Sequence, residues 1–154
     1  MKIEELATGS DLFCKVARGE VANRKVITEN KTSLAVFDHY PVSKGHTIVV
    51  PKRHIASLFE VTEEEILDIY RNIFQAKKVI EDALHRKDLP MPSGYNVGIN
   101  IGKASGQTVD HLHVHLIPRY EGDVEDPKGG VRGVIPSKQK YSGPPDDSVE
   151  DLLK

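Results

Sequence analysis

Three histidines stand at alternate positions within five residues of the chain. His111, His113 and His115 are separated by single aliphatic residues, and two more aliphatic residues follow. Because strand side chains switch faces at every residue, this alternation predicts a β-strand with all three imidazoles on one face. On a helix, at about 100° per residue, His113 would point almost opposite to the other two. The pattern therefore favours a strand that presents a row of imidazoles.

Such a row has three interpretations. The first is the solvated face of a half-exposed strand, although Thr, Lys or Glu would serve equally well. The second is a metal site, but a strand places His111 and His115 roughly 13 Å apart. One zinc ion, with nitrogen ligands at about 2.0–2.1 Å, cannot easily collect both, although one of them could join ligands from elsewhere. The third is a row along a bound polyphosphate, with one imidazole as nucleophile and the others as donors, and this suits an elongated anion best.

The residues around the row resemble a known family signature. Gly106-Gln107-Thr108-Val109 precedes the histidines, which themselves follow the pattern His-φ-His-φ-His-φ-φ with φ apolar. Together these features resemble the histidine triad (HIT) superfamily. The resemblance covers roughly residues 12–120 and includes, upstream and in order, Asp38, Pro41, Gly45-His46, Val50-Pro51 and His54.

The resemblance implies nucleotide binding, with transfer or hydrolysis at an α-phosphate. It assigns His113 as the nucleophile of a covalent nucleotidyl-histidine that water then cleaves. A neutral imidazole suits this role near neutral pH if an acceptor fixes the proton on its other nitrogen. The flanking His111 and His115 would contact phosphate oxygens or order the site. His46 matches a fourth histidine that supports the triad, and Gln107 matches an amide that steers phosphate or the incoming water.

The same resemblance places further residues around the nucleotide. Asp38 matches a carboxylate that binds the ribose, a sensible pairing because a diol donates two hydrogen bonds to one carboxylate. Asn100 and Thr108 match phosphate-side groups, and Gln107 and His115 are expected to contact the nucleotide as well. The family's purine-pocket positions fall on Leu12, Phe13, Val16 and Val36.

Some relatives also bind structural zinc through Cys-x-x-Cys, a downstream histidine and the first triad histidine. Cys14, His54 and His111 match three of these positions, whereas Asp11 stands in place of the first cysteine. Aspartate can bind zinc, but the loss of one thiolate weakens the site. Zinc is therefore an alternative for these four residues and not a requirement, and no other cofactor is expected.

The motif also bears on the branch of the family. Gly-Gln-Thr-Val before the triad and Pro118-Arg119 after it are closer to dinucleoside polyphosphate hydrolases than to phosphoramidases, which usually carry Ser after the Gln and lack Pro-Arg. The expected substrate is one such as diadenosine tetraphosphate. A purine nucleoside phosphoramidase and a phosphorolytic nucleotidyl transferase are the alternative enzymes. A nucleotide-binding sensor or scaffold is the alternative outside enzymes, but it would not need the intact nucleophile His113.

Helix and strand patterns indicate how these residues are positioned. Residues 62–86 carry a capping box, Thr62 with Glu65, and an apolar stripe at helical spacing, which together predict one long helix. Apolar, β-prone runs predict strands at residues 25–28, 32–38, 46–51 and 95–101, with the histidine stretch as another. We expect an α+β fold of the HIT type. Its antiparallel sheet would have about five strands with the long helix packed on it, and the protein would form a two-fold homodimer as in relatives.

The composition and the positions of Gly and Pro predict the domain boundaries and the class of protein. Residues 1–11 are expected to be a flexible lead-in, residues 12–120 the HIT domain, and residues 121–154 an extended Gly- and Pro-rich tail with a mobile end. The 154 residues carry a formal net charge of −2, which argues against nonspecific nucleic-acid binding. The single cysteine excludes an internal disulfide. With no signal-like or transmembrane-length apolar run, a cytoplasmic protein that does not bind membranes is expected.

Overall fold

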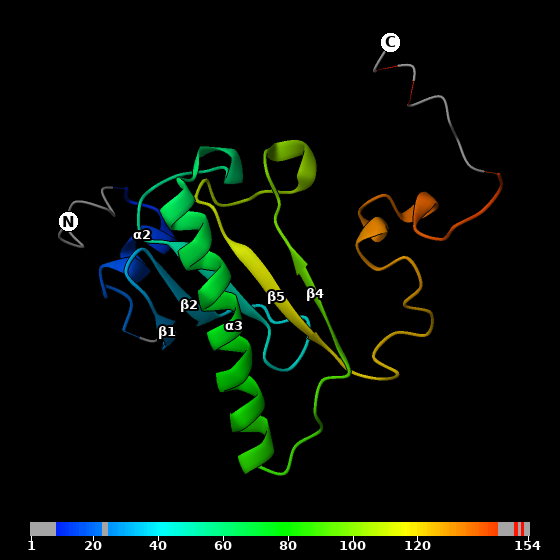
Figure 1. Ribbon diagram of the computed structural model, residues 1–154, viewed down its shortest axis with the longest axis horizontal. Helices are drawn as coiled ribbons and strands as arrows, with labels where there is room; N and C mark the ends of the chain where they lie inside the picture. Colours follow the sequence, from blue (N-terminus) through cyan, green and yellow to red (C-terminus); the bar gives the residue numbers. More distant parts are fainter. Residues whose placement is uncertain (1–8, 23–24, 145–149, 151, 153–154) are drawn as a thin grey trace. The chain divides into compact units, whose positions relative to one another are not determined.

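Five antiparallel strands form one sheet in the computed structural model, which describes residues 9–22, 25–144, 150 and 152. Their order is β1-β2-β3-β5-β4, so β5 lies between β3 and β4, and β1 and β4 are the edges (Figure 1). This confirms the predicted α+β fold with a five-stranded antiparallel sheet. The strands are β1 (Val26–Glu29), β2 (Ser33–Phe37), β3 (Thr47–Pro51), β4 (Gly94–Gly98) and β5 (Val114–Arg119).

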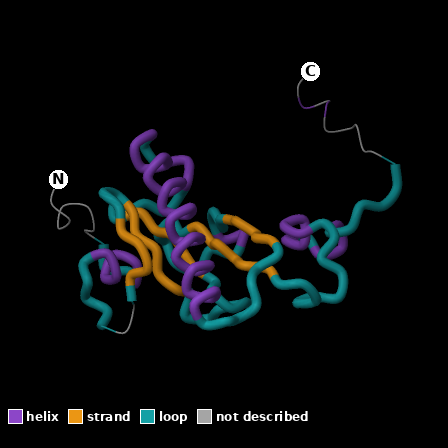
Figure 2. Tube along the Cα trace, turned by 60° about the horizontal axis from the view of Figure 1, so that its bottom comes forward, coloured by secondary structure: helices purple, strands orange, loops and turns teal. Residues whose placement is uncertain are grey.

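The long helix α3 (Glu63–Arg86) begins where its capping box predicts. The Thr62 hydroxyl accepts the N–H of Glu65, and the Glu65 carboxylate accepts the N–H of Thr62. The helix lies across one face of the sheet (Figures 1 and 2). Among the described residues, no helix combines the length and apolarity needed to cross a bilayer. The core between α3 and the sheet contains Ala35, Val49, Ile69, Ala76, Ile80, Leu84, Leu112, Val114 and Leu116.

A short helix, α2 (Leu12–Ala17), has no counterpart among the predicted elements. One oxygen of Asp11 caps it by accepting the N–H groups of Phe13 and Cys14 at 2.8 and 3.0 Å. Asp11 therefore belongs to the domain and not to the lead-in predicted for residues 1–11, of which residues 1–8 lie outside the described part of the chain. The helix packs on the alternate side chains of β2 and β3, in a second core of Phe13, Cys14, Val16, Ala17, Leu34, Val36, Ile48 and Val50.

The histidine stretch is only partly a paired strand. Pairing of β5 with β3 reaches Val114, and pairing with β4 reaches His115, so His111 and His113 precede the ladder. The predicted division of faces still holds. Alternate aliphatic residues of this stretch are buried in the core under α3, whereas the rings of His111 and His113 contact Phe13 of α2.

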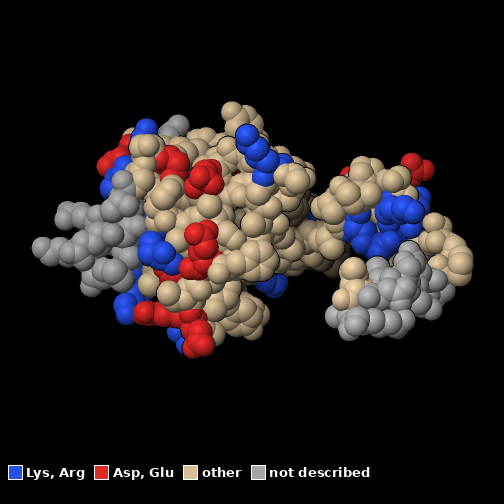
Figure 3. Space-filling view, turned by 90° about the horizontal axis from the view of Figure 1, so that it is seen from above, with Lys and Arg blue, Asp and Glu red and all other residues tan. Residues whose placement is uncertain are grey.

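Residues from Val124 onward form a second compact unit. Two short 3₁₀ turns, Gly130–Val134 and Pro136–Lys138, are closed by Arg132, which donates to the carbonyls of Lys138 and Gln139 at 2.9 and 3.1 Å. This part of the predicted extended tail is therefore folded locally. Figure 3 shows Lys and Arg side chains gathered on one face of this unit. The end predicted to be mobile falls largely on residues 145–149, 151, 153 and 154, which lie outside the described residues.

Candidate active site

A pocket of about 370 Å³ lies beside the triad, within the range of small-molecule sites, about 300–1,000 Å³. Two predicted purine-pocket residues, Leu12 and Phe13, line it, whereas Val16 and Val36 are buried in the core under α2. The fold thus brings most of the predicted site together. The predicted catalytic and nucleotide-binding residues that line the pocket are Asp38, His46, Asn100, Thr108, His113 and His115.

The backbone holds the His113 ring in one orientation. Its Nδ1 lies 2.8 Å from the carbonyl oxygen of His111, and because a carbonyl can only accept, Nδ1 carries the proton. A neutral His113 then presents a lone pair at Nε2. The residue is 8% exposed and lines the pocket. The ring of Phe13 packs against it, with 5.1 Å between the two ring centroids. One fixed nitrogen and one available lone pair are what a nucleophilic imidazole requires.

His46 and His115 form a hydrogen-bonded pair with a defined order of protons. The N–H of Val42 donates to His46 Nδ1 at 3.1 Å, so the proton of a neutral His46 lies on Nε2 and is donated to His115 Nδ1 at 2.9 Å. His115 in turn keeps its own proton on Nε2, as a donor for a phosphate oxygen. Burial lowers the pKa of both imidazoles, and Asp38, 3.6 Å from His46, opposes it. Both rings are therefore neutral near neutral pH.

Two predicted catalytic residues do not line the pocket. Oε1 of Gln107 accepts the N–H of Gly102 at 2.7 Å, and its Nε2 donates to the carbonyl of Ala56 at 2.9 Å. Its amide therefore joins two loops and is not directed at a phosphate. His111 is fully buried and supports His113 through its carbonyl. Its ring does not line the pocket, where a phosphate contact was expected, but forms part of a neighbouring cluster of side chains.

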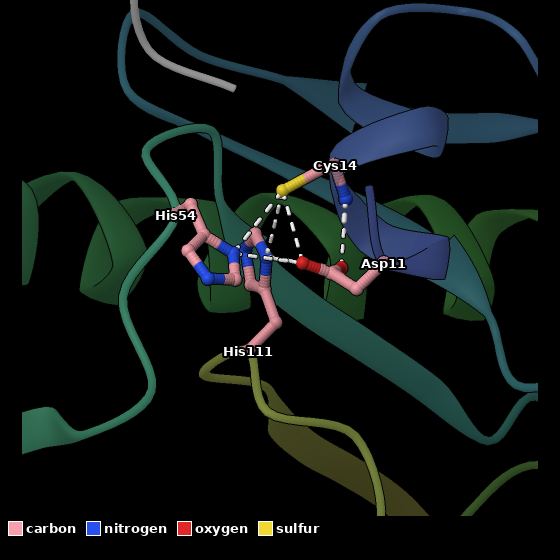
Figure 4. Close-up of side chains that lie close together, drawn as sticks. All are labelled: Asp11, Cys14, His54 and His111. Carbon is pink, nitrogen blue, oxygen red and sulfur yellow. Dashed lines mark hydrogen bonds and ion pairs between the residues drawn. The ribbon is translucent and has the colours of Figure 1, made fainter. Parts of the chain in front are cut away.

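That cluster contains the four residues considered for zinc, Asp11, Cys14, His54 and His111 (Figure 4). Asp11 Oδ2 lies 2.7 Å from His54 Nδ1 and 3.0 Å from Cys14 Sγ. The same sulfur lies 3.3 Å from His54 Nδ1 and 3.4 Å from His111 Nδ1. One ligand atom from each residue lies within 4.8 Å of the others. Residues from three separate segments thus converge on one point.

The donor chemistry of this cluster fits a divalent metal ion. Nε2 of His111 lies 2.9 Å from the carbonyl of Pro51 and must donate to it, so a neutral His111 turns its Nδ1 lone pair toward the cluster. Burial lowers the pKa of His111 and favours this neutral form. The lone pair faces the Asp11 carboxylate oxygens at 3.2 and 3.3 Å, an unfavourable opposition that a cation between them relieves. Tetrahedral zinc would space such ligand atoms about 3.3–3.6 Å apart. The distances of 3.3 and 3.4 Å from the Cys14 sulfur to the two histidine nitrogens match this spacing, whereas Asp11 Oδ2, at 2.7 and 3.0 Å from its neighbours, lies at hydrogen-bonding distance.

The cluster shifts the pKa values of its carboxyl and thiol groups in opposite directions. Burial opposes ionisation of Asp11, but hydrogen bonds from Cys14 and the nearby His111 outweigh it and lower the pKa of Asp11 to about 2. Burial and the neighbouring Asp11 raise the pKa of Cys14 to about 11. A bound zinc ion would be held by these four residues and would ionise the thiol, since coordinating thiols are deprotonated.

Known proteins share both the sequence and the fold. A family model described as the HIT domain matches residues 19–122. An uncharacterised HIT-like protein of Methanocaldococcus jannaschii is 41% identical over 119 residues, 77% of this chain and 86% of that protein. An adenosine 5′-monophosphoramidase of Candida albicans is 36% identical over 112 residues, 73% of this chain and 72% of that protein. An AP-4-A phosphorylase of Mycobacterium tuberculosis is 37% identical over 99 residues, 64% of this chain but only 48% of that protein.

The fold is also shared with a protein of known crystal structure. A HIT family protein from Bacillus subtilis superposes with a TM-score of 0.67 at 28% identity, covering 94% of this chain and 91% of that one. The matched region holds the whole triad together with His46. The chain therefore belongs to the HIT domain family of nucleotide hydrolases and transferases.

Proposed function

We propose that the protein is a hydrolase that cleaves dinucleoside polyphosphates at the α-phosphate through a nucleotidyl-His113 intermediate. The observation that carries the proposal is the orientation of His113, with Nδ1–H given to the His111 carbonyl and the Nε2 lone pair available at the pocket. The motif from Gln107 to Arg119 and the similarity to an AP-4-A phosphorylase support this substrate class.

Two displacements complete the reaction. His113 Nε2 attacks the α-phosphorus, a P–N bond forms, and the P–O bond to the leaving phosphate breaks with its electron pair. The imidazole becomes cationic, and the His111 carbonyl at Nδ1 stabilises that charge. His115 donates Nε2–H to a phosphate oxygen. Water then attacks the same phosphorus, the P–N bond breaks, His113 leaves neutral, and one water proton passes to solvent.

The nucleoside is held by other groups. Asp38 lies at the pocket with one oxygen accepting the N–H of Tyr40 at 2.8 Å, which fixes the carboxylate. Its second oxygen lies 3.6 Å from His46 Nε2 and 3.8 Å from His115 Nδ1, and we assign this oxygen to the ribose hydroxyls, as the family resemblance implies. Asn100 and Thr108 line the same pocket and are the proposed phosphate contacts. Binding and bond formation are thus assigned to different residues.

A phosphoramidase is the second candidate, and a specific observation favours it. Among the described residues that line the pocket there is no Lys or Arg. A chain of several phosphates would carry more negative charge than this lining balances, whereas a nucleoside phosphoramidate carries little. The similarity to an adenosine 5′-monophosphoramidase points the same way. Added inorganic phosphate would reveal the phosphorolytic alternative.

The test is turnover with identified products on diadenosine polyphosphates and on adenosine phosphoramidate, each with and without phosphate. His113→Ala should lower kcat by about 10³-fold or more while nucleotide binding survives, because only the covalent step is lost. With α-labelled substrate and an alkaline quench, wild type should retain label on His113. A chiral α-phosphorothioate should give net retention from two inversions. Net inversion, or more than about a tenth of wild-type kcat in His113→Ala, would contradict the mechanism.

We also propose the homodimer expected from the sequence, formed through the sheet edge β4 and the adjoining face of α3. The rings of Tyr70 and Phe74 on α3 are 57% and 58% exposed and contact each other at 4.8 Å. Val97 on β4 is 47% exposed. Tyr95 of β4 donates its hydroxyl to Glu81 of α3 at 2.7 Å, so the two surfaces adjoin.

A further inference from the structure

We propose that Tyr40 forms a subsite for the second nucleoside of a dinucleoside polyphosphate, whose base stacks on its exposed ring. This role deepens the proposed function and rests on its substrate class, because a mononucleotide or a simple phosphoramidate has no second base. It gives the pocket a means of recognising a dinucleoside substrate that does not depend on positive charge.

The apolar residues that line the pocket divide into a buried inner wall and an exposed rim. Phe13 and Ile48 are buried, whereas Tyr40 and Val42 are 89% and 72% exposed. Phe13 of the inner wall is one of the residues that the family resemblance assigns to the first base. The ring of Tyr40 has too little buried area to contribute much to the fold. Its exposed face is the kind of surface on which a nucleic-acid base stacks.

The size of the pocket leaves the second nucleoside outside it. The volume of about 370 Å³ lies near the lower end of the range for small-molecule sites, about 300–1,000 Å³. A nucleoside with its α-phosphate suits such a space, whereas a dinucleoside polyphosphate adds further phosphates and a second nucleoside, which extend past the rim. Because the polyphosphate chain rotates about its P–O bonds, the second base can return to the rim, where Tyr40 offers an aromatic face.

The loop that carries Tyr40 is fixed on both sides of this residue, while the ring stays exposed. The N–H of Tyr40 donates to the Asp38 carboxylate at 2.8 Å, and the N–H of Val42 donates to His46 Nδ1 at 3.1 Å. The N–H of Asp38 donates to the carbonyl of His46 at 3.0 Å and closes the loop. A tyrosine on an ordered backbone loses little conformational entropy on binding, because only its two χ angles become fixed. Tyr40 is therefore a preformed platform.

The same hydrogen bonds place the rim beside the groups assigned to the first nucleotide. Asp38 is the proposed ribose contact, and His46 donates to His115, the proposed phosphate donor. Since the described lining of the pocket contains no Lys or Arg, stacking on Tyr40 is the attraction that would distinguish a dinucleoside from a mononucleotide. Removal of an aromatic ring from under a stacked base typically weakens binding about 5- to 150-fold.

Calorimetric titration of the full-length protein tests the subsite, with His113→Ala as the parent so that no ligand is turned over. The ligands are diadenosine tetraphosphate, AMP and adenosine tetraphosphate, which has the same phosphates but no second nucleoside. Tyr40→Ala is the main variant and keeps the backbone N–H that fixes Asp38. Tyr40→Phe keeps the ring. Phe59→Ala removes an exposed ring that does not line the pocket and is the matched control.

Tyr40→Ala should weaken the binding of diadenosine tetraphosphate about 5- to 150-fold and change the affinities for adenosine tetraphosphate and AMP less than about twofold. Tyr40→Phe and Phe59→Ala should bind all three ligands like the parent. In protein labelled with fluorotyrosine, the ¹⁹F resonance that Tyr40→Phe removes should shift with diadenosine tetraphosphate and not with adenosine tetraphosphate. With His113 restored, Tyr40→Ala should lower kcat/KM for diadenosine tetraphosphate by the same factor and leave turnover of adenosine phosphoramidate unchanged.

Two results would overturn the proposal. An equal loss of affinity for all three ligands would move Tyr40 to the first nucleoside, and an unchanged affinity for diadenosine tetraphosphate would remove it from the site. If the second base stacks on Tyr40 but the protein with His113 intact does not hydrolyse dinucleoside polyphosphates, the subsite is upheld and the proposed hydrolase fails instead. If hydrolysis proceeds and Tyr40→Ala leaves it unchanged, the hydrolase stands and the subsite fails.

Discussion

The pocket residue with the clearest separate task is Asp38. Because its carboxylate is fixed through Tyr40 and lies outside the bond-breaking step, Asp38→Ala should weaken the binding of nucleosides and nucleotides alike while leaving inorganic phosphate binding nearly unchanged. Loss of charged hydrogen bonds to a diol should cost on the order of 1.5–3 kcal/mol, measured by calorimetry. A 2′,3′-dideoxy ligand is the control and should bind wild type and variant equally. Unequal affinities would move Asp38 away from the ribose.

For single residues, the sequence predicted which side chains line the pocket, but not which ring nitrogen of each histidine carries the proton. The alternation predicts His113 and His115 as site residues, the family resemblance adds Asp38, and all three line the pocket. The tautomers of His113 and His46 depend on two backbone groups of their own segments, the His111 carbonyl and the Val42 N–H. The direction of these groups follows from the local backbone conformation, which the pattern of side chains does not encode. Gln107 is likewise engaged by two backbone groups, so its type indicated an amide at the site but not its direction.

At the scale of the elements, the length of a helix decided whether the sequence could predict it. The helix α3 has a capping box and an apolar stripe over 24 residues, so its start and end were both predicted well. Helix α2 has only six residues, too few to be stable or periodic alone, and is held by the Asp11 cap and by its buried face. An aspartate before an apolar run was its one available signal, and it was interpreted as a zinc alternative instead of a cap.

One buried carboxylate joins α3 to the β1–β2 turn. Oδ2 of Asp68 accepts from the N–H and hydroxyl of Thr32, both at 2.9 Å, and from the hydroxyl of Ser33 at 2.8 Å. Asp68→Ala should leave the buried Thr32 N–H without a partner and lower the free energy of unfolding by about 3 kcal/mol in urea titration. Asp82→Ala, which removes an exposed ion pair with Lys78, should change it by less than about 0.5 kcal/mol. Similar losses in both variants would contradict the assignment.

The start of α3 also makes stability depend on pH. The Arg53 guanidinium, at 2.7 and 2.8 Å from the two oxygens of buried Glu65, lowers the pKa of that carboxyl below its usual value, despite its burial. A carboxyl whose pKa is lower in the folded state stabilises the fold above the unfolded-state pKa, and this contribution is lost as pH falls through the folded-state pKa. The difference in unfolding free energy between wild type and Glu65→Gln should therefore shrink from about pH 6 to about pH 3. A difference that grows with acidity would reverse the sign and reject the account.

At the scale of the whole molecule, the sheet has two edge strands, β1 and β4, and the proposed dimer forms through β4. β4 pairs with β5 on one side only, and unpaired backbone groups at a sheet edge are a template for further pairing. The exposed rings of Tyr70 and Phe74 lie on α3, which is joined to β4 through the hydrogen bond from Tyr95 to Glu81, and they offer apolar area that an edge contact alone lacks. Antiparallel pairing of β4 with its own copy, with these rings packed across the two-fold axis, would satisfy both features at once.

Sedimentation velocity at micromolar concentration tests this arrangement. Wild type should sediment as a dimer, and Phe74→Glu should sediment as a monomer, because two carboxylates would be buried near the two-fold axis without partners. Phe59→Glu is the matched control, since this ring is 86% exposed but lies in the turn Leu58–Glu60, away from β4 in sequence and pairing. It should remain dimeric. A monomeric wild type would reject the dimer, and a Phe74→Glu protein that stays dimeric would place the interface on another surface.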